Sequence, residues 1–147
     1  MEFKEKKIKE FIEDLASDKA SPGGGSTAAL ILSLSVALNK MVYSLSIGKK
    51  TFENLNEEKK IKMLQCNEES ESFIDKAFEY MEKDRSDFLK LMNSYKMNKD
   101  TDEEKEVRTN TIIENTVNAM LTPLNLAREA ISYYKNISFA IENGNKN

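Results

Sequence analysis

Apolar residues recur along this chain every three or four positions, which is the spacing of α-helices, and strand-forming residues are not clustered anywhere. The first such group comprises Ile8, Phe11, Ile12 and Leu15. It predicts a short helix with one apolar side that ends before Ser21-Pro22. A second helix is predicted after three consecutive glycines, with Ser26 or Thr27 as its N-cap, running to about Ile47. Because this helix is apolar nearly all round, we expect other helices to surround it.

Small residues form a stripe along this second helix at Ala29, Ser33 and Ala37. Such a stripe allows another helix to approach closely, from the same chain or from a second copy. Gly48 is suited to the left-handed position that ends a helix, and Lys49 and Lys50 then place positive charge near the negative end of the helix dipole.

The second half of the chain predicts further long helices. Asn56 is a capping residue for a segment that keeps a helical rhythm up to Met97, as one very long helix or as two broken near residues 68–72. Thr101 and Glu104 form a capping box for the last helix, in which Pro123 predicts a bend and Gly144 a stop. We therefore expect one domain over residues 1–147, an all-α, up-and-down bundle of four to five helices around one long, nearly all-apolar helix.

The composition limits the partners, metal sites and catalytic groups that this chain can have. The 147 residues include 22 Lys and Arg against 25 Asp and Glu, a net charge of −3 that argues against nucleic acid as a partner. Cys66 is the only cysteine and there is no histidine, which excludes an intrachain disulfide, the usual zinc patterns and imidazole bases. We therefore expect no metal site, and any catalysis has to use carboxylates, lysines, hydroxyls or backbone amides.

The N-terminal segment alternates charges with single apolar residues, so it is not a signal peptide, and we expect a cytoplasmic protein. The uncharged stretch Thr27 to Asn39 contains serines and stops at Lys40. It is shorter than the roughly 20 apolar residues that a membrane span needs. We therefore interpret it as a buried core helix and expect no membrane partner.

The strongest local anomaly is the segment Pro22, Gly23, Gly24, Gly25 and Ser26. Glycine costs about 1 kcal/mol relative to alanine inside a helix, so three in a row suggest a backbone that something must approach closely. At a helix N-terminus, the free N–H groups favour an anion or a carbonyl-rich ligand. A tight turn between two helices is the equally simple alternative.

Asp84 is the second anomaly, because it occupies a position where the apolar rhythm of its helix calls for an apolar residue, and Asp87 lies one turn further on. A desolvated carboxylate suits a general acid or base. The alternatives are an ion pair with Arg85 or Arg128, or an exposed place at the margin of the apolar stripe. Two interpretations also exist for Lys49 and Lys50. They bind a polyanion, or their charges only stabilise the C-terminal end of the preceding helix.

These pieces together resemble a known family. Ser21 to Ser26 (SPGGGS), Ile47 to Lys50 (IGKK), Asp84 to Phe88, Thr122-Pro123-Leu124 and Gly144-Asn145 are similar in sequence and spacing to the formiminotetrahydrofolate cyclodeaminase and methenyltetrahydrofolate cyclohydrolase-like family. The resemblance covers essentially the whole chain. Members usually continue beyond the Gly-Asn element, so the resemblance also implies that C-terminal helices of the family are lacking here.

The resemblance implies an all-helical dimer that closes 5-formiminotetrahydrofolate to 5,10-methenyltetrahydrofolate with release of ammonia, as in histidine degradation. The methenyltetrahydrofolate cyclohydrolase reaction is one alternative, and a non-catalytic dimerisation or accessory subunit on the same scaffold is another. It further implies a folate derivative as substrate, no permanently bound cofactor, and a possible formiminotransferase partner. Residues 22–26 would contact the folate, and Lys49 or Lys50 would meet the glutamyl carboxylates. Asp84 and Asp87 are the candidate catalytic carboxylates, with Asp84 either as the acid/base or as the group that orients the pterin, and the sequence does not decide which of the two carboxylates acts.

Overall fold

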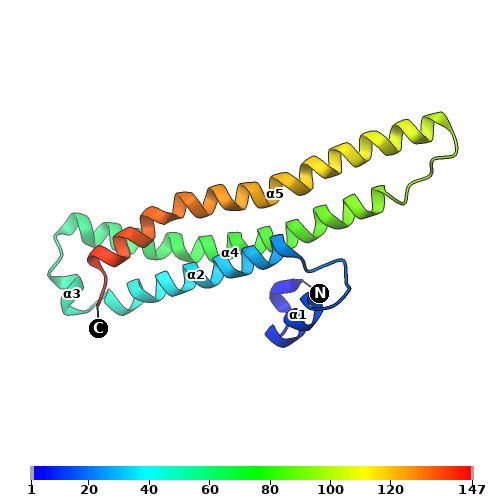
Figure 1. Ribbon diagram of the computed structural model, residues 1–147. Helices are drawn as coiled ribbons and strands as arrows, with labels where there is room; N and C mark the ends of the chain where they lie inside the picture. The colour runs from blue at the N-terminus through cyan, green and yellow to red at the C-terminus, as the bar shows by residue number, and fades with distance from the viewer. Residues whose placement is uncertain (1, 147) are drawn as a thin grey trace. The chain divides into compact units, whose positions relative to one another are not determined.

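The computed structural model describes residues 2–146, and all regular structure within them is helical (Figure 1). The elements are the 3-10 helix η1 (Phe3–Glu5) and the α-helices α1 (Ile8–Leu15), α2 (Gly24–Ser46), α3 (Lys50–Glu53), α4 (Glu57–Ser94) and α5 (Asp102–Asn143). The predicted all-α class and the long apolar helix are therefore confirmed. The four-residue α3 was not predicted, because it is too short to show a periodic pattern.

The chain forms two compact units. Unit 1 holds the chain up to Ala29 together with residues 79–127, and unit 2 holds Leu30–Phe78 together with the residues from Arg128 onward. The three long helices each contribute a part to both units, so each unit combines segments that are distant in the sequence. The expectation of a single domain over 1–147 stays a prediction.

Unit 1 combines the N-terminal elements and the first residues of α2 with parts of α4 and α5. Phe3 and Phe11 are buried, and their rings meet edge to face with centroids 5.5 Å apart. Phe11 is the only member of the predicted apolar side of α1 that is buried, whereas Ile8 and Ile12 are exposed. The amphipathic pattern of α1 thus predicted the helix but not the burial of its apolar side.

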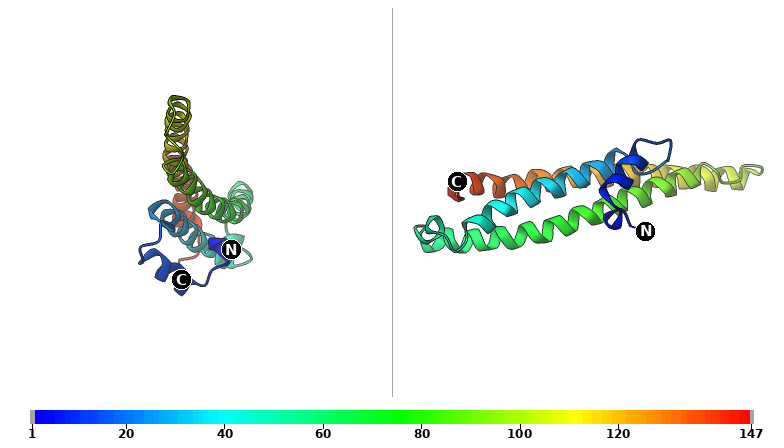
Figure 2. Two further views of the ribbon diagram at one scale, coloured as in Figure 1. Left: turned by 90° about the vertical axis from the view of Figure 1, so that its right-hand side faces the viewer. Right: turned by 90° about the horizontal axis from the view of Figure 1, so that it is seen from below.

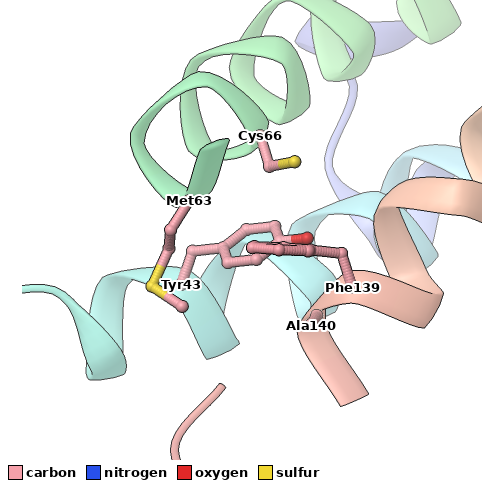
Figure 3. Close-up of a cluster of buried hydrophobic side chains, with 5 residues drawn as sticks. All are labelled: Tyr43, Met63, Cys66, Phe139 and Ala140. Atoms are coloured by element: carbon pink, nitrogen blue, oxygen red, sulfur yellow. The ribbon is translucent and has the colours of Figure 1, made fainter. Parts of the chain in front are cut away.

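Unit 2 has a core made by three helices. Tyr43 of α2, Met63 and Cys66 of α4, and Phe139 and Ala140 of α5 pack together as one buried cluster (Figure 3). Figures 1 and 2 show the corresponding parts of α2, α4 and α5 side by side. Gly144 follows α5 as predicted, and the Asn145 N–H donates to Ser46 Oγ at 2.7 Å, which ties the chain after α5 to the end of α2.

Several helices begin or end where the sequence predicts. The Asn56 side chain accepts a hydrogen bond from the N–H of Lys59, and the Thr101–Glu104 capping box forms in both directions. Gly48 has φ of 74°, the left-handed conformation expected after α2. Residues 57–94 form one helix, so the lapse in apolar rhythm near residues 68–72 does not break it. Pro123 lies inside the continuous α5, and the predicted bend there stays a prediction.

The predicted start of α2 was wrong. The helix begins at Gly24 rather than after Ser26 or Thr27, and the Gly23 carbonyl accepts the first helical hydrogen bond from the N–H of Thr27 at 3.0 Å. Gly24 and Gly25 therefore belong to the first helical turn. Because the hydroxyl of Ser26 bonds to α4 instead of to its own helix, it does not act as a cap.

The expectation that other helices surround α2 was also wrong. By length and composition alone α2 is apolar enough to cross a membrane, yet only 28% of its most apolar window is buried inside the protein. Val36 and Tyr43 on one side are fully buried, while Leu34 and Leu38 on the other are more than half exposed. The apolar composition of α2 indicates that burial of its side chains is favourable. It does not identify the segments that cover them.

Candidate functional site

Unit 1 brings the glycine segment and Asp84 together at the N-terminus of α2. The N–H and the hydroxyl of Ser26 both donate to Asp84 Oδ2, at 2.8 and 2.9 Å, and the Ser26 side chain is fully buried. The carboxylate of α4 therefore lies at the positive end of the α2 dipole, where negative charge is stabilised. This places Asp84 in the position that the sequence suggested for an incoming anion.

Gly25 makes this approach possible. A Cβ at position 25 would overlap the carboxyl group of Asp84, whereas a Cβ at Gly23 or Gly24 would meet nothing within 4 Å. Glycine at position 25 is thus required by a contact within the chain, and the sequence prediction that something approaches this backbone closely is explained by Asp84. The other two glycines leave open space at the start of α2.

Asp87 lies one turn further along α4 and is 4% exposed. Its Oδ2 accepts hydrogen bonds from Lys83 Nζ at 2.6 Å and from Thr122 Oγ1 of α5 at 2.7 Å. Burial raises the pKa of this carboxyl, but the hydrogen bonds from Lys83 and Thr122 and the charges of Lys83 and Lys90 outweigh burial and leave the pKa below its ordinary value. Asp87 is therefore a buried carboxylate that stays ionised at neutral pH.

The N-terminal 3-10 helix packs on α4 next to Asp84. Glu82 accepts a hydrogen bond from the backbone N–H of Phe3, and the guanidinium of Arg85 lies 4.7 Å from the centre of the Phe3 ring. In the loop before α2, the buried Ser21 Oγ has no hydrogen-bond partner among the residues that the structure describes. Buried hydroxyls are nearly always satisfied, so this atom is suited to a polar group supplied from outside the chain.

Lys49 and Lys50 lie at the other end of α2, in unit 2, and both are exposed. Within the described chain neither forms a hydrogen bond or an ion pair through its ammonium group. The residues predicted to form one site therefore fall into two groups. Residues 22–26, Asp84 and Asp87 belong to unit 1, and the two lysines belong to the end of α2 in unit 2.

Sequence reasoning missed Thr122 as a site residue. It stands directly before Pro123 in the last helix and holds the Asp87 carboxylate from α5. The segment Thr122-Pro123-Leu124 carries part of the family resemblance, and that resemblance was the available signal for a site residue here. The sequence did not show which group the Thr122 hydroxyl contacts. Lys83, four residues before Asp87 on the same helix, could have been found from that spacing alone.

Unit 2 contains a buried polar network of its own. Asn39 Nδ2 donates to Tyr133 Oη at 2.9 Å and to Asn136 Oδ1 at 3.0 Å, and Tyr133 Oη lies 2.6 Å from Ser70 Oγ. Tyr133 and Asn136 also line a hollow of about 840 Å³ between α4 and α5. None of the predicted site residues lines it, and the network is internally satisfied, so we interpret it as structural.

The comparisons with known proteins agree on one family. A family model described as formiminotransferase-cyclodeaminase matches residues 7–147. The chain is 33% identical over 140 residues to a methenyltetrahydrofolate cyclohydrolase of Methylorubrum extorquens, covering 95% of this chain and 65% of that protein. It is 29% identical to the formimidoyltransferase-cyclodeaminase of Gallus gallus and 28% identical to that of Rattus norvegicus, covering 24% and 21% of those proteins.

Proposed function

Because this chain belongs to the formiminotransferase-cyclodeaminase family, a family of folate-dependent one-carbon enzymes, we propose that it acts on a tetrahydrofolate derivative at the site formed by residues 22–26, Asp84 and Asp87. The observation that carries this proposal is the Asp84 carboxylate, held by Ser26 at the N-terminus of α2 and only partly buried. The unpartnered hydroxyl of Ser21 next to the glycines supports a polar ligand there.

The proposed reaction is cyclisation of 5-formiminotetrahydrofolate to 5,10-methenyltetrahydrofolate. The second folate nitrogen attacks the carbon of the formimino group, which enters in its protonated form. The proton of the attacking nitrogen passes to the former imino nitrogen, the bond to that nitrogen breaks, and it leaves as ammonia. One carboxylate can remove the proton from the attacking nitrogen and return it to the leaving one, without histidine. We assign this transfer to Asp84, because Asp87 is held in its ionised form by Lys83 and Thr122.

Asp87 has a different proposed role. The methenyl product carries a positive charge, and a buried carboxylate that remains ionised stabilises such a cation as it forms. Asp87 also anchors α4 to α5 through Thr122, so it fixes the helix turn that carries Asp84.

The cyclohydrolase reaction is the second candidate. The 33% identity to the Methylorubrum protein named for that reaction, higher than the identity to the formimidoyltransferase-cyclodeaminases, favours it. Hydrolysis of the methenyl group needs a base that removes a proton from the attacking water and an acid that protonates the folate nitrogen as its bond to the carbon breaks, and a single carboxylate can serve both roles. The names of the animal relatives combine two activities, and on that basis we also propose a separate formimidoyltransferase partner as the source of the formimino substrate.

The test is turnover of 5-formiminotetrahydrofolate and of 5,10-methenyltetrahydrofolate, followed by the absorbance of the methenyl compound. Asp84→Asn should lower turnover at least about a hundredfold while the helical circular dichroism is retained. Asp75→Asn, an exposed carboxylate on the same helix, is the matched control and should be neutral. Near-normal turnover of Asp84→Asn would remove Asp84 from the catalytic role.

The rival proposal is a scaffold without folate chemistry. Isothermal calorimetry with 5-formyltetrahydrofolate separates the two, since a scaffold subunit should give no binding heat up to millimolar ligand. That result would refute the enzyme function and leave the fold and family unchanged.

A further inference from the structure

The N-terminal segment of unit 1 packs on the turn of α4 that carries Asp84. Phe3 is buried, its backbone N–H donates to the Glu82 carboxylate, and its ring centre lies 4.7 Å from the Arg85 guanidinium. Because Glu82 and Arg85 lie two residues before and one residue after Asp84, both contacts fall on the same helical turn as that carboxylate. The Phe3 ring also meets Phe11 edge to face, which attaches α1 to α4 at this point.

Asp14, near the other end of α1, holds the loop that leads to the glycine segment. One of its carboxylate oxygens accepts a hydrogen bond from Lys6 Nζ, before α1, and the other accepts one from Lys19 Nζ, after α1. The Ser17 hydroxyl adds to this, since it donates to the Asp14 carbonyl at 2.7 Å and accepts from the Lys19 N–H at 3.2 Å. The Asp14 side chain is only 16% exposed. Two cations on one largely covered carboxylate form a network, the arrangement in which ion pairs contribute measurably.

Together these contacts join the Asp84 turn of α4 to the loop at residues 17–23, entirely within unit 1. The loop contains the buried hydroxyl of Ser21, which has no hydrogen-bond partner among the residues that the structure describes. The Asp84 carboxylate is fixed separately, by its two hydrogen bonds from Ser26 of α2. The loop therefore depends on the N-terminal segment and α1 for its position, whereas the carboxylate does not.

We propose that Phe3 and Asp14 are positioning residues for ligand binding, which hold the loop at residues 17–23 and its Ser21 hydroxyl against the Asp84 turn before the ligand arrives. This inference rests on the proposed function, because that function names the folate that the loop receives. Phe3 precedes residue 7, where the match to the family model begins, so the family assigns it no role. The loop contributes to affinity, and the chemical step stays with the carboxylates.

Loss of these contacts should change the affinity for folate without changing the chemical step. A loop that is no longer held samples several conformations, and the apparent dissociation constant rises as the binding-competent one becomes rarer. A fall of the competent fraction to about a tenth weakens binding about tenfold. Saturating ligand restores that conformation, and Ser26 still holds Asp84. The turnover number at saturation should therefore stay close to that of the parent chain.

Calorimetry and steady-state kinetics separate affinity from chemistry. Phe3→Ala and Asp14→Asn should each weaken the binding of 5-formyltetrahydrofolate about tenfold. Both should leave kcat for 5-formiminotetrahydrofolate within about twofold of the parent value, a split that a general loss of folded protein does not produce. The matched controls are Asp18→Asn, an exposed carboxylate four residues after Asp14, and Ile8→Ala, an exposed apolar residue of α1. Both controls should behave like the parent chain.

Hydrogen exchange tests the position of the loop independently of any activity. The amides of residues 17–25 should exchange faster in Phe3→Ala and Asp14→Asn than in the parent chain, while those of residues 80–88 on α4 keep the parent rate. Saturating 5-formyltetrahydrofolate should restore the protection of residues 17–25 in both variants. If the loss of the buried Phe3 ring also loosens α4, Asp14→Asn, which leaves that ring in place, decides the outcome.

Three results would overturn the inference. The first is unchanged exchange at residues 17–25 in Asp14→Asn. The second is a fall in kcat at an unchanged dissociation constant, which would mean that the N-terminal segment acts on the carboxylates. The third is an equal effect of Asp14→Asn and Asp18→Asn, which would assign the effect to net charge. Absence of both folate binding and turnover in the parent chain would instead refute the proposed function, and the exchange rates would then decide alone whether Phe3 and Asp14 hold the loop.

Discussion

Gly25 and Gly24 provide a matched pair for testing what the glycine segment is for. Both lie in the first turn of α2 with backbone dihedrals that alanine can adopt, since Gly48 alone has a positive φ among the described residues. They differ in their surroundings, because only the Cβ at position 25 would overlap Asp84. Gly25→Ala should therefore push the carboxylate off Ser26, and Gly24→Ala should not.

The size of the effect follows from the contacts that are lost. Asp84 accepts two hydrogen bonds from Ser26, and a bond to a charged group contributes about 1.5–3 kcal/mol when it is buried. Because Asp84 is only partly buried, water replaces part of this, and we expect Gly25→Ala to lower the free energy of unfolding by about 2–3 kcal/mol. Gly24→Ala should be neutral or stabilise the chain by up to about 1 kcal/mol, since alanine restricts the unfolded chain.

Urea unfolding followed by circular dichroism measures both variants and a double-mutant cycle. In an Asp84→Ala background the obstacle at position 25 is absent, so Gly25→Ala should cost nothing there. Equal effects of the two glycine substitutions would refute the reasoning, as would an unchanged cost of Gly25→Ala in the Asp84→Ala background. Either result would mean that the turn itself, not the approach of Asp84, requires glycine.

Three further predictions concern the contacts that hold the helices together. The pKa of Asp87 is lowered in the folded protein, so its ionised form stabilises the fold above the ordinary carboxyl pKa, and this contribution is lost as the pH falls through the lowered pKa. Asp87→Asn should therefore flatten the decline of unfolding free energy between about pH 5 and pH 2, measured by urea titration; an unchanged slope would contradict the assigned pKa direction. Thr122→Val should lower the free energy of unfolding by about 1–2 kcal/mol while Thr122→Ser retains most of it, and equal losses would mean that the hydroxyl contributes nothing. Tyr43→Phe removes the hydroxyl that donates to Asn136 Oδ1 at 2.6 Å inside unit 2 and should cost about 1–2 kcal/mol; a neutral effect would show that the network is not structural.

The helices could be predicted because their signals are local. Asn56, Thr101 with Glu104, and Gly48 each act through residues within one turn, so the sequence alone located those ends. The covered side of α2 could not be predicted, because it depends on which residues of α4 and α5 reach it. An apolar stretch shows that contact is favourable but carries no information about the partner.

The site was predictable in part for the same reason. Asp84 could be detected because it is a carboxylate at a position where the helical spacing calls for an apolar residue. The three glycines could be detected because they predict a backbone that another group contacts closely. That these two anomalies explain each other could not be seen, because 58 residues separate Ser26 from Asp84 in the sequence. Thr122 lacked any local signal for its bond to Asp87, since that contact exists only once α4 and α5 are packed.

Cys66 gives experimental access to unit 2 alone. It is the only cysteine of the chain and is buried in the cluster with Tyr43 and Phe139 (Figure 3). Burial raises the pKa of its thiol, which further suppresses the reactive thiolate. Because Cys66 is 5% exposed and borders the hollow between α4 and α5, a disulfide reagent should modify it slowly in the closed unit and faster when unit 2 opens, so the labelling rate under native conditions reports on unit 2 separately from any opening of unit 1.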